Sequence, residues 1–164
     1  RSDKKKNHHN ILDSLAIHYL DLILFQMGTI KSSNYYPRLV SKKGDSYDTC
    51  RLALETVNAS VIIYCSYANP KINEIVIIGT NGYITIRDNK KEIFSPRDTF
   101  DPKGFFVKPP MIENKDFNFE NEYIDSLKKS LEYFMEYVKN KKLIDLENFD
   151  KGIMTTKLLI ELKQ

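Results

Sequence analysis

The chain has 164 residues, of which 41% are hydrophobic and 29% are charged, and its formal net charge is +3. This composition is typical of one globular domain with a sizeable core and excludes an intrinsically disordered chain. The 25 basic and 22 acidic residues create no strong field, so we expect no nucleic-acid partner. Because no apolar run reaches the roughly 18 residues of a membrane span, we also expect no membrane partner and a cytoplasmic location.

The first predicted element is a helix from Asn10 to Gly28. Its apolar residues fall on nearly every side of a helical wheel, which is typical of a buried helix. Asn10 or Asp13 can cap its first amides, and Gly28 stands where a left-handed residue often ends a helix. We expect the rest of the chain to be organised around this helix.

Three polar side chains remain within this apolar segment. Ser14, His18 and Asp21 are spaced by four and then three residues, which places them on one face of the helix. One interpretation is a core histidine that is bonded to a backbone carbonyl or to Asp21. The other interpretation is a face that the helix keeps for binding or catalysis.

The following segments predict an edge strand and a hairpin. Ile30 to Ser41 is expected at a sheet edge, because Pro37 removes a ladder donor. From Tyr47 the apolar residues alternate, which predicts a half-buried strand with Cys50, Leu52, Leu54 and Thr56 on one face.

A two-residue loop at Asn58 and Ala59 would return the chain as the second strand of this hairpin. That loop would place Leu54 opposite Ile63 and Leu52 opposite Cys65. Cys50 and Cys65 would then be diagonal neighbours, and two cysteines are too few for a disulfide scaffold, so we expect reduced thiols.

A second hairpin follows. Glu74 to Gly79 is an apolar run typical of a strand, and Asn81-Gly82 predicts a tight turn before a return strand from Tyr83 to Arg87. A short strand is expected at Ile93 and Phe94. The segment from Ser95 to Phe117 holds four of the six prolines and predicts a long loop.

Two helices close the chain. Asn118 or Asn121 begins the first, which ends near residue 141, and Asp145 begins the second, which ends near residue 162. Gly152 is expected to allow another backbone to approach closely. The residues predicted to be buried are Tyr123, Ile124, Leu127, Leu131, Phe134, Met135 and Val138 in the first helix and Phe149, Ile153, Leu159 and Ile160 in the second.

Together these elements predict an α+β fold in a single domain over residues 1–164. A mostly antiparallel open sheet of about six strands would pack one face against the helices. Its other face is mixed in character and suits a subunit interface. The side chains on that face are Arg51, Ala53 and Glu55 opposite Ser66, Tyr64 and Ile62. His8 and His9 have no neighbouring cysteine or carboxylate cluster, so no metal site is predicted.

Two stretches resemble one known family. The first runs from Leu15 to Gly28, LAIHYLDLILFQMG, and the second runs from Ile75 to Ile84, IVIIGTNGYI. In their order and rough spacing they resemble the C-terminal domain of the Gfo/Idh/MocA oxidoreductases. The two closing helices, with Gly152, resemble the pair that ends that domain.

The resemblance implies roles for the polar face of the opening helix. His18 matches the family's active-site histidine, which faces the substrate, and would be catalytic. Ser14 stands where the family has an acidic residue and would hydrogen-bond the substrate. Asp21 would orient the imidazole at the same substrate-binding face.

The family binds NAD or NADP through an N-terminal domain that contains a glycine-rich loop. The six glycines here form no G-x-G-x-x-G, so this chain is not expected to bind a cofactor alone. Because the chain begins with Arg1 rather than Met, we expect the C-terminal fragment of a two-domain dehydrogenase that is not active by itself.

The expected function is therefore that of the substrate-binding and dimerisation domain of an NAD(P)-dependent oxidoreductase. Its partners would be a second copy, bound through the open sheet face, and a small substrate with a hydroxyl-bearing carbon, such as a sugar or cyclitol. The alternative is a non-catalytic dimerisation or regulatory module, which the serine at position 14 permits.

Overall fold

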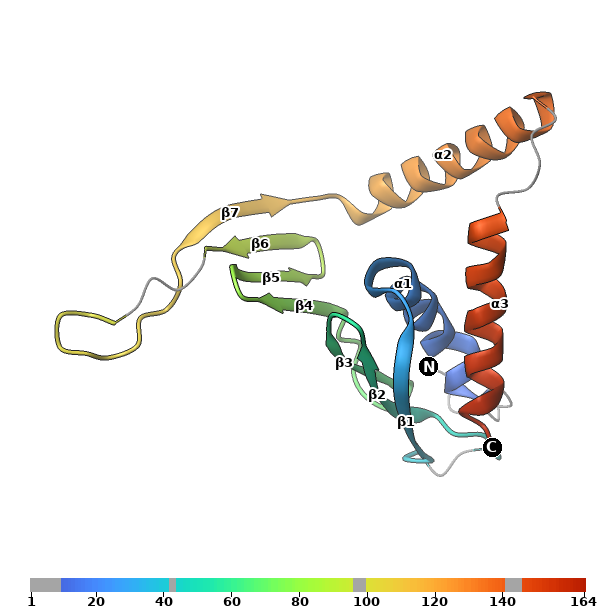
Figure 1. Cartoon of the computed structure of the whole chain (residues 1–164), viewed down its shortest axis with the longest axis horizontal. Helices are drawn as coiled ribbons and strands as arrows, with labels where there is room; N and C mark the ends of the chain where they lie inside the picture. Colours follow the sequence, from blue (N-terminus) through green and yellow to red (C-terminus); the bar gives the residue numbers. More distant parts are fainter. Residues whose placement is uncertain (1–9, 42–43, 96–99, 141–145) are drawn as a thin grey trace. The chain divides into compact units, whose positions relative to one another are not determined.

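The computed structural model describes residues 10–41, 44–95, 100–140 and 146–164 (Figure 1). These residues divide into two compact units. Unit 1 combines Arg1–Pro70 with Leu143–Gln164, and unit 2 is Lys71–Lys142. His8, His9 and the predicted helix cap Asp145 lie outside the described residues.

The opening helix of unit 1 has two parts. A π-helical turn, η1, spans Leu12–Ala16, and helix α1 continues over Ile17–Met27. Asn10 Oδ1 accepts a hydrogen bond from the Leu12 amide at 3.0 Å, and Gly28 ends the helix with a φ of 77°. The predicted ends of this helix are therefore confirmed, with Asn10 as the cap.

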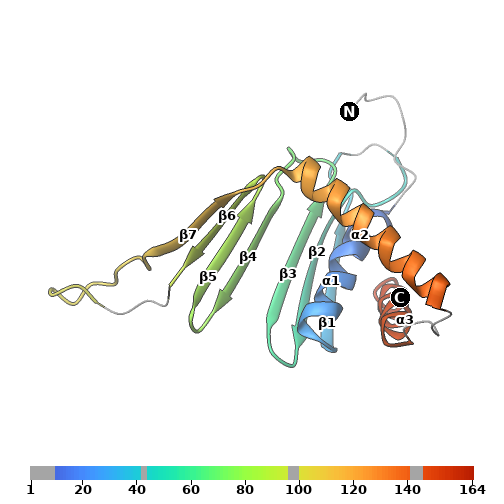
Figure 2. The same cartoon turned by 90° about the horizontal axis from the view of Figure 1, so that it is seen from above.

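Three antiparallel strands form the sheet of unit 1 in the order β1-β2-β3 (Figure 2). Their bounds are Ile30–Arg38 for β1, Thr49–Thr56 for β2 and Ser60–Ser66 for β3. The strand β1 lies at the edge and contains Pro37, as predicted. One face of the sheet carries Cys50, Leu52, Leu54, Ile63 and Cys65, which form the core with Ile11, Leu12, Ala16 and Leu20 of the opening helix.

The predicted register of the β2–β3 hairpin is wrong by two residues. Leu52 pairs with Ile63, and Cys50 lies directly opposite Cys65. The turn lies one residue earlier than predicted, at Val57 and Asn58, since the Thr56 amide donates to the Ala59 carbonyl oxygen at 2.9 Å. Thr56 Oγ1 stabilises it by accepting hydrogen bonds from the amides of Asn58 and Ala59, at 3.2 and 2.9 Å. A shift of two residues keeps every side chain on its face, so the alternation alone could not reveal it.

The two cysteines are free thiols, as predicted, and both are buried in the core. A hydrogen bond from Cys50 to Cys65, together with burial, raises the pKa of the Cys50 thiol. Cys50 is therefore protonated and unreactive at neutral pH, because the thiolate is the reactive form.

Helix α3 spans Leu146–Glu161 and packs on α1 within unit 1. It buries Leu159 as predicted, and among the side chains of this helix whose burial is described the other buried one is Thr155. Gly152 has no described heavy atom within 4 Å of the position that a Cβ would take, so the predicted close approach is wrong. The remaining residues of this helix that were predicted to be buried, Phe149, Ile153 and Ile160, are exposed.

The opening helix buries one stripe rather than its whole surface. Its buried residues are Ile11, Leu12, Ala16, Leu20 and Leu24, whereas Leu22 and Phe25 are exposed. The prediction of a helix buried on nearly every side is therefore wrong, because the sheet and α3 cover only part of its circumference. The uncovered part includes His18 and Asp21.

Four antiparallel strands form the sheet of unit 2 in the order β4-β5-β6-β7 (Figure 2). Their bounds are Glu74–Gly79, Gly82–Arg87, Lys90–Phe94 and Met111–Asp116. The predicted hairpin is confirmed, with Gly79 opposite Gly82 across the turn Thr80-Asn81. A Cβ at Gly82 would lie 2.1 Å from the Phe94 carbonyl oxygen, so this close approach requires glycine. The strand β7 was missed because it falls in the segment predicted as a loop.

Helix α2 of unit 2 spans Phe119–Asn140. Asn118 caps it by accepting hydrogen bonds from the amides of Glu120 and Asn121, at 3.0 and 3.1 Å, which confirms one of the two predicted caps. Its predicted apolar stripe is present in the sequence, but none of its side chains is buried. The exposed residues of the stripe are Tyr123, Ile124, Leu127, Leu131, Phe134, Met135 and Val138.

The described elements confirm the predicted α+β class, with antiparallel strands and three helices, which are the opening helix (η1 with α1), α2 and α3. The strands number seven rather than about six, and they form two hydrogen-bonded sheets of three and four strands instead of one. The break falls between β3 and β4, where the turn at Asn69-Pro70 separates the two units.

Candidate functional site

The candidate site is the uncovered face of the opening helix in unit 1. Leu20 and Leu24 anchor α1 in the core, so the opposite side of the helix is held at a fixed orientation. His18 and Asp21 lie on that side and are exposed, while Ser14 in η1 is half-buried. The structure therefore places the three predicted site residues along one helix, but at different depths.

Ser14 is fixed by its neighbours. Its hydroxyl donates to the Asn10 carbonyl oxygen at 3.0 Å and accepts from the Tyr67 hydroxyl at 3.0 Å. Asn10 Oδ1 also accepts from the Tyr35 hydroxyl at 3.3 Å. Burial, with a smaller contribution from Cys50, raises the pKa of Tyr35 to about 12, so this phenol remains a donor at neutral pH.

One acceptor position of the Ser14 hydroxyl is left for another group. A hydroxyl has one proton and two lone pairs, and the Asn10 and Tyr67 contacts use the proton and one lone pair. Ser14 can therefore accept a hydrogen bond from a ligand hydroxyl without breaking the network that holds it.

Asp21 is tied to α3. The Thr155 hydroxyl donates to Asp21 Oδ1 at 3.0 Å, and Thr155 itself is only 3% exposed. This bond joins residues that are 134 positions apart. Sequence reasoning missed Thr155, as it missed Tyr67, because a helical period cannot show which side chains meet across two elements.

His18 is exposed and has no hydrogen bond or ion pair with the described residues. The interpretation as a satisfied core histidine is therefore wrong for this structure. The predicted orientation of the imidazole by Asp21 stays a prediction, since the hydrogen bond that the structure records for Asp21 is the one from Thr155.

Apolar side chains lie on the same face. Leu22 and Phe25 follow His18 by four and seven residues, which is the spacing of one helical face, and Phe25 is 57% exposed. The ammonium of Lys151 from α3 lies 4.9 Å from the centre of the Phe25 ring. The face therefore combines an imidazole, a carboxylate and a hydroxyl with an aromatic ring, a combination that suits a ligand with both polar and C–H surfaces.

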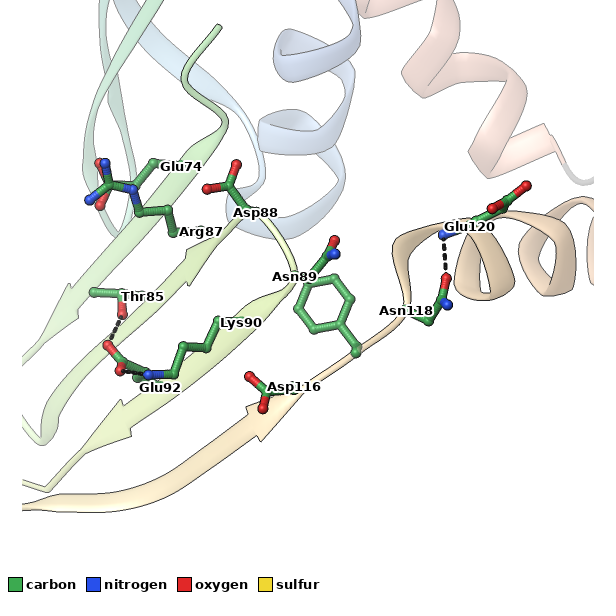
Figure 3. Close-up of a pocket in the computed structure, with 11 residues that line it drawn as sticks. Glu74, Thr85, Arg87, Asp88, Asn89, Lys90, Glu92, Asp116, Asn118 and Glu120 are labelled. Atoms are coloured by element: carbon green, nitrogen blue, oxygen red, sulfur yellow. Dashed lines mark hydrogen bonds and ion pairs between the residues drawn. The ribbon is translucent and has the colours of Figure 1, made fainter.

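A second hollow lies in unit 2, where the polar ends of β5 and β6 meet the start of α2 (Figure 3). Its volume is about 1030 Å³, and it is open to solvent. Lys90 Nζ lies 2.8 Å from Glu92 Oε1, and the Thr85 hydroxyl lies 3.3 Å from Glu92 Oε2. The hydrogen bond from Lys90 lowers the pKa of the Glu92 carboxyl.

This hollow is a weaker candidate than the helix face. Its carboxylates Glu74, Asp88, Asp116 and Glu120 are all exposed, and no buried polar group points into it. Within the described ranges, no cluster of three or more histidine, cysteine or acidic side chains has the arrangement that would bind a metal ion. None of the helices in the described part of the chain has the length and apolarity to span a bilayer.

Comparison with curated proteins finds no match for this chain. Solved structures do resemble it. An oxidoreductase from Agrobacterium radiobacter, in complex with NAD+, L-tartaric acid and magnesium, matches with a TM-score of 0.64 and 18% identity over 92% of this chain and 46% of its own. A structure from Thermotoga maritima matches with a TM-score of 0.61 and 17% identity over 99% of this chain and 47% of its own.

A third similar structure is the biliverdin reductase of Synechocystis, in complex with biliverdin and NADP+. It has a TM-score of 0.58 and 13% identity over 90% of this chain and 44% of its own. These likenesses show the fold, and the chain spans about half the length of each of these proteins. The family model described as the oxidoreductase family, C-terminal alpha/beta domain, matches residues 2–162. The chain therefore belongs to the Gfo/Idh/MocA oxidoreductase family, as its C-terminal domain.

Proposed function

We propose that this chain is the substrate-side domain of an NAD(P)-dependent oxidoreductase, in which a separate N-terminal domain binds the dinucleotide. Family membership over residues 2–162 supports the proposal. So does the half-length match to two proteins whose structures contain NAD+ or NADP+. The native gene product should then have about twice the 19.2 kDa of this chain, a prediction that its intact mass tests directly.

The observation that carries the proposal is the fixed, uncovered face of the opening helix. Three polar groups lie on it, and one of the two exposed ones, His18, has no partner among the described residues. An imidazole has one nitrogen that donates and one that accepts a hydrogen bond, so it can polarise a substrate hydroxyl or relay its proton. Asp21 and Ser14 flank His18 and supply two further hydrogen-bonding groups for a hydroxylated substrate.

The substrate is proposed to be a small polyhydroxy compound, such as a sugar or cyclitol. The free lone pair of Ser14 and the carboxylate of Asp21 accept hydrogen bonds from hydroxyls. The exposed ring of Phe25 offers an apolar surface for the C–H side of such a molecule. L-Tartaric acid in the Agrobacterium structure is likewise a small hydroxylated compound.

The described residues of this chain do not form a dinucleotide site. The positive-φ glycines Gly28, Gly44, Gly82 and Gly104 are at least 16 positions apart in the sequence, so they do not form one glycine-rich phosphate-binding loop. The cofactor, when bound to the N-terminal domain, would accept or donate hydride at the substrate carbon. This chain would bind the substrate, orient it and transfer the hydroxyl proton.

A homodimer through the open face of the β1–β3 sheet is part of the proposal. That face carries Tyr36, Ile62 and Tyr64, and Ile62 is 74% exposed. The Arg51 guanidinium lies over the Tyr36 ring at 4.4 Å. Aromatic and arginine side chains of this kind are enriched in protein interfaces. An Ile62→Lys variant should sediment as a monomer, whereas a dimer of unchanged stability would contradict this interface.

The second candidate function is a dimeric or regulatory module without catalysis. It is favoured by Ser14, which replaces an acidic residue of the family and is already held by Tyr67 and Asn10. This function predicts a native gene product that folds and dimerises but does not oxidise polyols with NAD+ or NADP+.

Substitution of His18 distinguishes the two functions. In the complete oxidoreductase, His18→Ala should lower turnover by about a hundredfold, because general acid and base groups contribute at least that much. Stability should change by less than about 0.5 kcal/mol, because the side chain is exposed. Gln26→Ala, at another exposed position of α1, is the matched control and should retain full turnover. Full turnover in His18→Ala would contradict the catalytic role.

A further inference from the structure

The hydrogen bond between Thr155 and Asp21 joins the buried face of α3 to the exposed face of α1. The Thr155 hydroxyl lies 3.0 Å from Asp21 Oδ1 and also 3.0 Å from the Lys151 carbonyl oxygen of its own helix. One hydroxyl proton serves one acceptor at a time. The carboxylate is the stronger acceptor, since hydrogen bonds to charged groups are about twice as strong as neutral ones.

A threonine is not needed for packing at this position. Thr155 is 3% exposed and lies in the α1–α3 contact, where a valine would fill the same volume without burying a hydroxyl. A hydrogen bond from the hydroxyl to a carbonyl of its own helix adds little stability, because that carbonyl already accepts a backbone hydrogen bond. Its bond to Asp21 is the contact that valine could not make.

This bond restricts the Asp21 side chain. An exposed aspartate ordinarily samples several χ1 rotamers, and one fixed acceptor contact selects among them. Oδ1 is taken by Thr155, and no donor of the described residues contacts Oδ2. Oδ2 is therefore the oxygen that is available to a substrate at this face.

We propose that Thr155 is a positioning residue, which acts through Asp21 to fix the carboxylate at the substrate-binding face. The inference rests on the proposed function, because Asp21 must contact substrate for its orientation to matter. Thr156 offers a contrast within the same helix. Its hydroxyl donates to the Gly152 carbonyl oxygen at 3.0 Å, and its side chain is exposed.

The orientation of Asp21 can be measured on the 164-residue chain. Three-bond couplings between the amide nitrogen and the carboxyl carbon of Asp21 report its χ1 populations by NMR. We expect one dominant rotamer in the wild type and in Thr156→Val, averaging in Thr155→Val, and recovery in Thr155→Ser, which restores the donor. The same rotamer population in Thr155→Val as in the wild type would overturn the inference, whatever the function proves to be.

The consequence for the reaction is measured in the complete oxidoreductase. Thr155→Val should raise KM about tenfold, the cost of loosening one charge-assisted hydrogen bond. Its kcat should change less than twofold, because His18 is untouched. Thr155→Ser should restore KM, and Thr156→Val should match the wild type.

Asp21→Asn separates failure of the inference from failure of the proposed function. If Asp21→Asn raises KM and Thr155→Val does not, then Asp21 contacts substrate without help from Thr155 and the inference is wrong. If neither variant changes KM, Asp21 does not contact the substrate, and the substrate-binding role proposed for it fails, whereas the χ1 populations of Asp21 decide the inference separately. If KM rises in both Asp21→Asn and Thr155→Val, and Thr155→Ser restores it, the result supports the inference and the proposed function.

Discussion

The two units of the chain differ sharply in how they bury their apolar side chains. In unit 1 the opening helix, the β1–β3 sheet and α3 share one core, which includes Leu12, Leu20 and Leu52. In unit 2 Phe94 is the one buried hydrophobic residue among those described, although β4 and α2 are rich in isoleucine, leucine and aromatic residues. Unit 1 therefore has a core of its own, whereas unit 2 leaves most of its described apolar side chains exposed.

This difference bears on function. A catalytic or binding face must be held by residues whose positions are fixed by packing. The face of α1 meets that condition, since Leu20 and Leu24 bury the opposite side of the same helix and Thr155 holds Asp21. The open hollow of unit 2 does not meet it, because none of the side chains that line it is buried.

The largest expected effect comes from matched leucine truncations in the two units. Leu52→Ala, in the core of unit 1, should lower the free energy of unfolding by about 3 kcal/mol through lost burial and the cavity left behind. Leu127→Ala, at a residue of α2 that is 53% exposed, should change it by less than about 0.5 kcal/mol. Urea denaturation of the chain measures both. Equal losses would show that unit 2 has a core like that of unit 1.

A smaller effect is expected from the buried carboxylate of Asp48 in unit 1. Its oxygens accept hydrogen bonds from the amides of Val40 and Ser41, each at 2.9 Å, and from the Ser41 and Thr49 hydroxyls. Asp48→Asn replaces one of the two acceptor oxygens with an NH2 group, which cannot accept these hydrogen bonds. The substitution should therefore lower the free energy of unfolding by about 2 kcal/mol. Asp45→Asn, at an exposed position of the same loop, is the control and should leave the free energy of unfolding almost unchanged.

The pH dependence of this loss has a defined sign. Burial alone would raise the pKa of Asp48, but the hydrogen bonds from Ser41, Val40 and Thr49 outweigh it and hold the pKa below its ordinary value. A lowered folded-state pKa stabilises the protein above the unfolded pKa of about 3.9, and this contribution disappears as the pH falls through the folded value. The difference between wild type and Asp48→Asn should therefore shrink below about pH 4. A difference that does not change with pH would contradict the carboxylate's role.

The smallest expected effect has the opposite sign. Gly152 lies inside α3, and a Cβ there would meet no described atom within 4 Å. Gly152→Ala should therefore raise the free energy of unfolding by about 0.5–1 kcal/mol, the difference in helix propensity. Thermal unfolding is the measurement. A destabilised variant would show that another backbone approaches α3 at this residue in the protein in solution.

Local sequence determined the secondary elements of this protein. Asn10, Gly28 and Asn118 set helix ends through side-chain caps and a left-handed φ, which depend on nearest neighbours in the chain. Alternation identified the buried face of β2, and Asn81-Gly82 located the second hairpin. The stretches from Leu15 to Gly28 and from Ile75 to Ile84 together indicated the family, which the match over residues 2–162 confirmed.

Only the tertiary structure decided how these elements meet. Period two is unchanged by a shift of two residues, so the pattern could not show that Cys50 pairs with Cys65. An apolar stripe does not reveal whether anything covers it, and the stripe of α2 is exposed where burial was expected. The contact of Thr155 with Asp21 depends on the packing of two helices that are far apart in sequence. Sequence therefore supplied the face with His18, and packing determined which of its side chains are fixed and which are free to bind.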